Sequence, residues 1–370
     1  MTACRSSQRH VSQSLVISVD AMGGDHGPSV VVPGIAQALR ALPGVRLLLH
    51  GDGAAIEAEL SKWPAAKAVS EVRHCDKAIG MDEKPAQAMR RGKGSSMWNA
   101  IEAIRENQAQ ACVSAGNTGA LMAISKLILR MGAELERPAI VANWPTMKGV
   151  TTVLDVGANV ESDASQLVEF AIMGAAFHHA VHGAKRPTVG LLNVGSEDQK
   201  GHEEVREAHA ILRETALDFD YHGFVEGNDI AHGTVDVVVT DGFTGNVALK
   251  TAEGLARFFS NEIKSTLTSG PLAMLGALIA SGALKKMRQR LDPSRVNGAP
   301  LLGLNGIVVK SHGGADADGF ASALKVATNL ARSDFRAEID RNLKRLTATA
   351  ATGKPGDGPG AGADAKGAAE

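Results

Sequence analysis

Glycine-rich segments of this chain carry residue types that bind and activate anions. In Asp236–Lys250, a valine-rich run is followed by DGFTGN (Asp241–Asn246) and then by helix-forming residues. A buried strand that ends in such a loop leaves the free N–H groups of the next helix, and the positive end of its dipole, at the strand's carboxyl end. The pattern predicts an anion site, and the chain repeats it several times.

The most polar of these segments is GSEDQKGH (Gly195–His202), which combines a hydroxyl, two carboxylates and an ammonium group. We expect Lys200 to bind phosphate as a point charge. The alternative is a surface ion pair between Lys200 and either Glu197 or Glu203. His202 lies in this segment and is a candidate acid–base group.

Two neutral amides, Asn228 in EGND and Asn246 in DGFTGN, are candidate donors to an oxyanion or a phosphate. Asn and Gly are also common in tight turns, and this is the alternative for both segments. The other candidate phosphate or substrate ligands all lie in glycine-rich segments after an expected strand. They are Asp20, Gly23, Gly24, Asn117, Thr118, Asn159, Asn193, Ser196, Glu197, Gly242, Thr244, Gly245, His312, Gly313 and Gly314.

For DAMGGD (Asp20–Asp25) the alternative is a turn with a capping aspartate, and for SAGNTG (Ser114–Gly119) it is a helix N-cap. His312, like His202, is a candidate acid–base group. His178 and His182 share one helix face before Gly183, without a third ligand in the sequence. We therefore expect cations at a helix C-terminus here, and no metal site.

Strand-to-loop-to-helix units position all of these residues. The expected strands are Leu15–Asp20, Arg46–His50, Ala111–Ser114, Thr152–Val156, Thr188–Val194, Asp236–Asp241 and Gly306–Lys310. Near-continuous apolar strands that alternate with helices predict an α/β fold, with a mostly parallel sheet and helices on both faces. Ligands of such sheets bind beyond the carboxyl ends of the strands, where the polar loops fall.

We expect a flexible leader at residues 1–14, a single α/β catalytic unit at 15–346 and a disordered Gly/Ala-rich tail at 349–370. A helical hairpin at about 252–292 interrupts the unit. It has an apolar stretch, Leu272–Leu284, followed by a basic cluster of Lys285, Lys286, Arg288 and Arg290.

The composition argues against several classes of protein function. The formal net charge is −1 and aromatic residues make up 4 %, which argues against a nucleic-acid partner. The three cysteines, Cys4, Cys75 and Cys112, have no zinc or disulfide spacing, so a reducing cytoplasm fits. Pro271–Leu284 is too short to span a membrane, which takes about 20 residues. No P-loop, dinucleotide loop or nucleophile elbow is present, so no cofactor is expected.

Taken together, these segments resemble the bacterial phosphate acyltransferases, the acyl-[acyl-carrier-protein]:phosphate transacylases of phospholipid synthesis. The matching stretches extend from Leu15 to about Ala331. They are VDAMGGDHGP (Val19–Pro28), SAGNTGALMA (Ser114–Ala123), DVGANV (Asp155–Val160), GLLNVGSEDQKG (Gly190–Gly201), FVEGNDI (Phe224–Ile230), DVVVTDGFTGNVALKTAEG (Asp236–Gly254) and LLGLNGIVVKSHGGADADGF (Leu301–Phe320).

The resemblance implies a fold akin to phosphotransacetylases and isopropylmalate-type dehydrogenases, and a homodimer. It also implies that an acyl carrier protein thioester and inorganic phosphate give an acyl phosphate, which a membrane-bound glycerol-phosphate acyltransferase consumes. We expect direct attack by phosphate, because a thiolate leaves readily and no protein nucleophile is evident. Lys200 would hold phosphate, Asn228 and Asn246 the oxyanion, and His202 or Asp241 the proton.

The acyl carrier protein is acidic, so we expect a local basic contact, with the hairpin cluster as the candidate. The hairpin would serve the dimer, the acyl chain, the carrier protein or a membrane surface. A dimer-core helix with a solvated basic end is an equal alternative.

Three rival functions have discriminating features. A phosphotransacetylase would use acyl-CoA for the same chemistry. A metal- and NAD-dependent dehydrogenase would need a dinucleotide loop and metal carboxylates, which the sequence lacks. A membrane scaffold would not need so many polar glycine loops.

Overall fold

The computed structural model describes residues 15–132, 135–285 and 297–352. These divide into two compact units, where the sequence predicted a single one. Unit 1 comprises the described parts of Met1–Leu129 and Gly306–Ala331, and unit 2 those of Arg130–Asn305 and Arg332–Glu370. The predicted leader at 1–14 and most of the predicted tail lie outside the described residues.

Unit 1 is a parallel sheet with the strand order β3-β2-β1-β4-β11. The strands are β1 (Leu15–Asp20), β2 (Val45–Gly51), β3 (Ser70–His74), β4 (Ala111–Ser114) and β11 (Ile307–Lys310). Its helices are α1 (Pro28–Ala38), the 3-10 turn η1 (Leu39–Ala41), α2 (Gly53–Leu60), α3 (Pro64–Lys67), α4 (Pro85–Arg91), α5 (Ser96–Arg105), α6 (Thr118–Leu129) and α13 (Ala317–Arg332). Strand β4 is buried throughout, as its continuous apolar sequence predicts.

Unit 2 is a mixed sheet with the order β10-β5-β6-β9-β7-β8. Strands β6 (Gly149–Leu154), β9 (Val237–Val239), β7 (Thr188–Leu192) and β8 (Asp220–Val225) are parallel, whereas β5 (Ala139–Thr146) is antiparallel to β6 and to β10 (Ala299–Leu302). The helices are α7 (Ala164–His182), α8 (Glu203–Glu214), α9 (Gly227–His232), α10 (Gly242–Leu267), α11 (Pro271–Ile279) and α14 (Phe335–Thr352). The mostly parallel α/β class predicted from the sequence is thereby confirmed.

Helix α7 forms the core of unit 2. A capping box of Asp163 and Gln166 begins it, and Gly183 ends it in a left-handed conformation. Its His178 was predicted to be a C-terminal cation, but its side chain is buried and burial lowers its pKa to about 4. The imidazole is therefore neutral near pH 7, and it bonds Thr152 Oγ1 at 2.9 Å.

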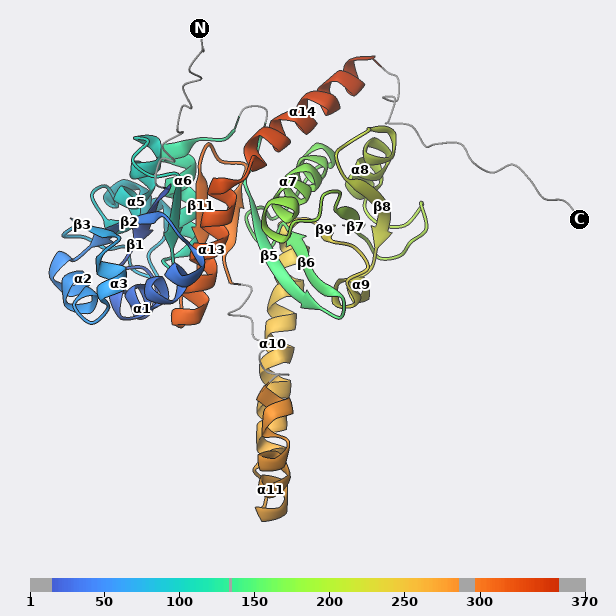
Figure 1. Ribbon diagram of the computed structural model, residues 1–370. Helices are drawn as coiled ribbons and strands as arrows, with labels where there is room; N and C mark the ends of the chain where they lie inside the picture. Colours follow the sequence, from blue (N-terminus) through green and yellow to red (C-terminus); the bar gives the residue numbers. More distant parts are fainter. Residues whose placement is uncertain (1–14, 133–134, 286–296, 353–370) are drawn as a thin grey trace, which may run out of the picture. The chain divides into compact units, whose positions relative to one another are not determined.

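The predicted hairpin is present, although its first helix starts earlier than expected. Helix α10 runs unbroken from Gly242, and α11 packs against it (Figure 1). Beyond Gly245 no α10 side chain is buried, and apolar α11 residues such as Leu272 and Ile279 are 85 % and 80 % exposed. Of the basic cluster, only Lys285 lies within the described residues, where it is exposed.

The boundary of the predicted tail also differs from expectation. Helix α14 continues to Thr352, although the tail was predicted from Thr349, because Gly353 is the first helix-breaking residue there. In the described part of the chain, no helix is long and apolar enough to cross a bilayer.

Candidate active site

The polar loops of unit 2 follow its four parallel strands. Residues 155–160 follow β6, 241–246 follow β9, 193–202 follow β7 and 226–229 follow β8. Because parallel strands end at the same edge of a sheet, these loops gather along one side of the unit. The sequence-predicted ligands of unit 2 therefore share this edge.

Asp155 organises the first of these loops. Its fully buried carboxylate accepts hydrogen bonds from the backbone N–H groups of Ile140, Gly157, Ala158 and Asn159, at 2.8–3.2 Å. Burial raises the pKa of this carboxyl group, and the hydrogen bonds oppose that effect. The side chain of Asn159, a predicted ligand, also donates to Asp155 and to the carbonyl of Pro138. The Asn159 side chain therefore holds the loop together through these hydrogen bonds.

The start of α10 packs directly on this loop. A Cβ atom at Gly242 would lie 2.1 Å from the carbonyl oxygen of Asn159, and one at Gly245 would lie 1.9 Å from that of Asp155. Only glycine permits this approach of a helix N-terminus to a neighbouring backbone. Both residues were predicted as ligands, and their contacts give them a packing role.

Asp241 caps the same helix. Its Oδ1 accepts the N–H of Thr244 at 2.8 Å, so this carboxylate serves the helix where the sequence suggested a proton carrier. Asn246, one turn further, is exposed and lies beside Gly157. Its amide has no hydrogen bond to a described residue, which leaves it available to a ligand.

Lys200 is exposed and forms an ion pair with Glu197 at 2.9 Å. The pairing raises the pKa of Lys200 and lowers that of Glu197. Of the two partners considered from the sequence, Glu197 is the one that Lys200 contacts. Glu226, before α9, adds a further electrostatic interaction with Lys200, which places the ammonium group near the β8 loop.

Asn193 holds the Lys200 loop closed. Its Nδ2 donates to the carbonyl of Lys200 at 3.0 Å, and its own N–H donates to the carbonyl of Val225. This predicted ligand is therefore a loop-closing residue. The remaining predicted residues of this edge, Ser196, His202, Asn228 and Thr244, are all exposed.

In unit 1, three glycine loops meet at the carboxyl ends of β1, β4 and β11. A Cβ atom at Gly23 would lie 2.6 Å from the backbone nitrogen of Gly116, and one at Gly24 would lie 2.8 Å from the carbonyl of Gly313. Gly24 also has a φ of +85°, which favours glycine. The close approach brings Gly23, Gly24 and Gly313 together, as predicted ligands of one site would require.

Beneath these loops lies a buried polar group that sequence reasoning only partly found. The carboxylate of Asp20 accepts a 2.7 Å hydrogen bond from Ser114 Oγ, which in turn accepts the N–H of Gly116 at 3.0 Å. Lys310 Nζ, also buried, donates to the carbonyls of Ala115 and Ser311. Burial raises the pKa of Asp20 and lowers that of Lys310 to about 8, while their charges stabilise each other.

Lys310 was not predicted as a site residue, because the glycine-rich segment that follows it, SHGG, carried the stronger ligand pattern. The available signal was a lysine at the last position of an apolar strand, IVVK, where a buried cation needs partners. Asp20, Ser114 and Lys310 occupy matching register positions on neighbouring strands, so the sheet itself brings them together.

Asn117 has a different role from the predicted one. Its Nδ2 donates to the carbonyls of Met81 and Glu83, at 2.7 and 2.9 Å, and its Oδ1 accepts the N–H of Ala120. It therefore ties the segment before α4 to the start of α6, whose first residue is Thr118. His312 and Gly314 are exposed, and Gly314 N–H donates to His312 Nδ1 at 3.1 Å.

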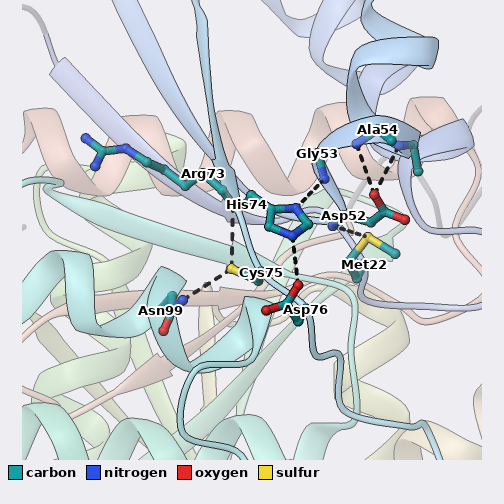
Figure 2. A network of polar contacts seen from close by, with 10 residues as sticks. Met22, Asp52, Gly53, Ala54, Arg73, His74, Cys75, Asp76 and Asn99 are labelled. Atoms are coloured by element: carbon teal, nitrogen blue, oxygen red, sulfur yellow. Dashed lines mark hydrogen bonds and ion pairs between the residues drawn. The ribbon is translucent and has the colours of Figure 1, made fainter.

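A further network ties the start of α2, the end of β3 and α5 together (Figure 2). His74 accepts the N–H of Gly53 and bonds Asp76 at 2.9 Å, while Cys75 Sγ accepts from the amide of Asn99. Burial raises the pKa of Cys75, as it does that of the fully buried Cys112. Neither thiol is set up as a thiolate nucleophile. The described residues also hold no group of three or more metal-ligating side chains of His, Cys, Asp or Glu.

Comparison with known proteins identifies the family. The model of the family described as "Fatty acid synthesis protein" matches residues 15–338. The phosphate acyltransferase of Caulobacter vibrioides is 93 % identical over 97 % of this chain and 100 % of its own length. That of Phenylobacterium zucineum is 62 % identical over 95 % of this chain and all of its own. The chain belongs to the bacterial phosphate acyltransferase family. It is an acyltransferase, and the family predicted from the motifs is confirmed.

Solved structures support the fold. A phosphotransacetylase of Streptococcus pyogenes aligns with a TM-score of 0.60 at 16 % identity, covering 86 % of this chain and 94 % of that one. A phosphotransacetylase of Staphylococcus aureus gives 0.56 at 15 % identity with the same coverage.

Proposed function

We propose that this acyltransferase forms an acyl phosphate by direct attack of inorganic phosphate on the thioester of a long-chain acyl carrier protein. The observation that carries the proposal is the exposed Lys200 ammonium, held in a glycine loop at the carboxyl edge of unit 2. The start of α10 supplies a helix N-terminus at the same edge. Together they form a site for a dianion.

The reaction would need little covalent help from the protein. A phosphate oxygen attacks the thioester carbonyl, a tetrahedral oxyanion forms, the C–S bond breaks, and the thiolate leaves and takes up a proton. Positioning of phosphate against the carbonyl lowers the barrier by about 7–11 kcal/mol. One well-placed oxyanion donor contributes about 3–4 kcal/mol more. The buried thiols of Cys75 and Cys112 agree with a mechanism that has no cysteine acyl-enzyme.

Lys200 and the loop amides hold phosphate in this scheme, and Asn246 and Asn228 are the oxyanion donors. Both asparagines are exposed at the edge that holds Lys200. His202, exposed at the start of α8, is the better remaining proton carrier because Asp241 caps α10.

An acyl phosphate is a reactive mixed anhydride, so an acyltransferase must consume it promptly. We propose that this consumer is a membrane-bound glycerol-phosphate acyltransferase, which places the reaction in phospholipid synthesis beside the cytoplasmic face of a membrane. The apolar side chains of α10 and α11 are proposed to be covered by a second copy of the chain in a homodimer.

The test is phosphate-dependent thiol release from a long-chain acyl carrier protein, with hydroxylamine trapping of the acyl phosphate. Thiol release that requires phosphate and yields trapped product would support the proposal. Turnover with acyl-CoA alone would assign the acyl-CoA-dependent reaction instead. No turnover with either donor would overturn both.

A further inference from the structure

Unit 1 has an exposed basic surface next to its glycine loops. Its core is α4, where Lys84, Arg90 and Arg91 line one surface hollow together with Ala86 and Gln87. We define these three cations, with Lys93, as the α4 basic surface. All four are exposed, and none forms an ion pair or a side-chain hydrogen bond with another described residue.

The charge is local to this segment. Lys77–Lys93 contains five Lys or Arg residues against only Asp82 and Glu83, in a chain whose formal net charge is −1. Arg90 and Arg91 occupy the last turn of α4, where the helix dipole favours cations. The dipole therefore accounts for Arg90 and Arg91 but not for Lys84, which lies at the opposite end of the helix. It also does not explain why the three cations line one hollow.

The surface also offers apolar contacts. Met81 and Met89, on the same segment, are 41 % and 37 % exposed. Methionine side chains adapt to the shape of a partner, and exposed methionines beside cations are typical of surfaces that bind acidic amphipathic helices.

Direct contacts connect this surface to the glycine loops of unit 1. Asn117, in the β4 loop, donates to the carbonyls of Met81 and Glu83, within four residues of Lys84. A Cβ atom at Gly313 would lie 2.6 Å from Met81 Cε, and one at Gly119 would lie 2.7 Å from Pro85 Cγ. A partner bound at α4 would therefore sit beside the carboxyl edge of the unit 1 sheet.

We propose that the α4 basic surface is the docking site for the acyl carrier protein. This inference rests on the proposed function, because that function supplies the acidic partner. The positive charge of the surface complements the negative charge of the carrier, and its position places a tethered acyl thioester beside the glycine loops of unit 1. Charge complementarity of this kind mainly accelerates encounter and selects the partner.

The experiment compares two charge-reversal pairs in the full-length chain. Arg90→Glu/Arg91→Glu changes the proposed surface. The matched control, Arg40→Glu/Arg46→Glu, changes two exposed and unpaired arginines of unit 1 near the amino end of β2. Steady-state kinetics with acyl carrier protein are measured at low and at high salt. Circular dichroism shows whether each variant is folded. Arg90→Gln/Arg91→Gln provides a milder variant if the reversed pair folds poorly.

The α4 variant is expected to raise the KM for acyl carrier protein about tenfold, with kcat and the phosphate KM changed less than about twofold. Added salt should raise the KM of the wild-type enzyme towards that of the variant, and the control should behave like wild type. A variant whose carrier-protein KM equals that of wild type overturns the inference.

Two further readouts separate this inference from the proposed function. If the wild-type protein has no turnover, the proposed function fails, and binding of holo acyl carrier protein by fluorescence anisotropy still tests the surface. Binding that α4 reversal weakens supports the docking site, whereas absent or unchanged binding overturns it. Loss of binding to phosphatidylglycerol vesicles with an unchanged carrier-protein KM would also overturn it, in favour of a membrane contact.

Discussion

At the scale of single residues, each unit combines exposed polar side chains in its loops with buried ones that hold the loops. Lys200 and Asn246 are exposed at the edge of unit 2, whereas Asp155 and Lys310 are buried and fully engaged. A buried charge is costly unless hydrogen bonds or an opposite charge stabilise it. Hydrogen bonds do so for Asp155, and hydrogen bonds together with the charge of Asp20 do so for Lys310. Each buried group therefore fixes the geometry of its own loop, and the exposed residues are the ones proposed to bind ligands.

Replacement of Lys200 by alanine should raise the KM for phosphate at least about tenfold, because the variant loses the point charge of the phosphate site. The thermal midpoint should stay close to that of wild type, because the ion pair with Glu197 is exposed. Phosphate titration at saturating acyl donor measures the first effect. An unchanged phosphate dependence would show that another residue holds phosphate, and Lys185→Ala, an exposed lysine of unit 2, is the control.

His50 should make the protein sensitive to acid. It is buried at the end of β2, neither ring nitrogen has a partner among the described residues, and burial lowers its pKa to about 4. Between about pH 4 and the ordinary value near 6.5, the unfolded chain binds a proton that the folded chain does not. Stability contributed by the neutral ring is therefore complete above pH 6.5 and is lost as pH falls towards 4.

The unfolding free energy of the wild-type protein should fall between pH 7.5 and pH 5. We expect this fall to be smaller by about 2 kcal/mol in His50→Leu. At pH 7.5 the variant should lie within about 1 kcal/mol of wild type, because it breaks no hydrogen bond. Urea unfolding at the two pH values measures both numbers. Parallel pH curves for variant and wild type would show that His50 does not carry this sensitivity.

At the scale of elements, α10 connects the site to the hairpin. Its first turn packs on the Asp155 loop through Gly242 and Gly245, while no later side chain of the helix is buried. Glycine is therefore required in the first turn of α10, where the backbone approaches the Asp155 loop. It is not required in the rest of the helix.

Two glycine substitutions in α10 test this division. Gly245→Ala puts a Cβ atom 1.9 Å from the carbonyl of Asp155, so we expect a loss of about 1–3 kcal/mol and a fall in kcat as the loop shifts. Gly254→Ala meets no atom within 4 Å and should be neutral or stabilise by up to about 1 kcal/mol. Denaturant melts and acyl phosphate formation measure both variants, and equal behaviour of the two would contradict the packing argument.

At the scale of the whole molecule, the exposed hairpin needs a covering surface. Leu272, Leu278 and Ile279 are 85 %, 71 % and 80 % exposed on α11, and Phe258 and Phe259 on α10 are more than half exposed. Apolar side chains exposed to this extent on two helices that pack together mark an interaction site.

Leu272→Glu/Leu278→Glu should convert a dimer to monomer, because charges buried in a dimer interface are strongly unfavourable. Sedimentation velocity over a range of concentrations measures the state, and liposome flotation measures membrane contact. A variant that remains dimeric but no longer floats with vesicles would assign the hairpin to the membrane. Lys264→Glu, an exposed change on α10, is the control for a simple charge effect.

The sequence by itself determined the α/β class, the family and the positions of the glycine loops. Strand patterns and glycine turns are local signals, and parallel strands necessarily place their following loops at one edge. Lys200 and Asn246 could be named as candidates because a side chain in such a loop lies at the strand's carboxyl end, where ligands of α/β sheets bind. Capping by Asp241 is also a local feature, although the sequence suggested this carboxylate as a proton carrier.

Only the tertiary structure decided which polar side chains remain free. Asn117 bonds the carbonyl of a residue 36 positions away, Ser114 bonds Asp20 across 94 positions, and Lys310 bonds Ala115 across 195. Such partners are set by sheet order and loop packing, which no local pattern contains. The same holds for the α4 basic surface. Its cations are plain in the sequence, but their closeness to the glycine loops arises from contacts between segments that are distant along the chain.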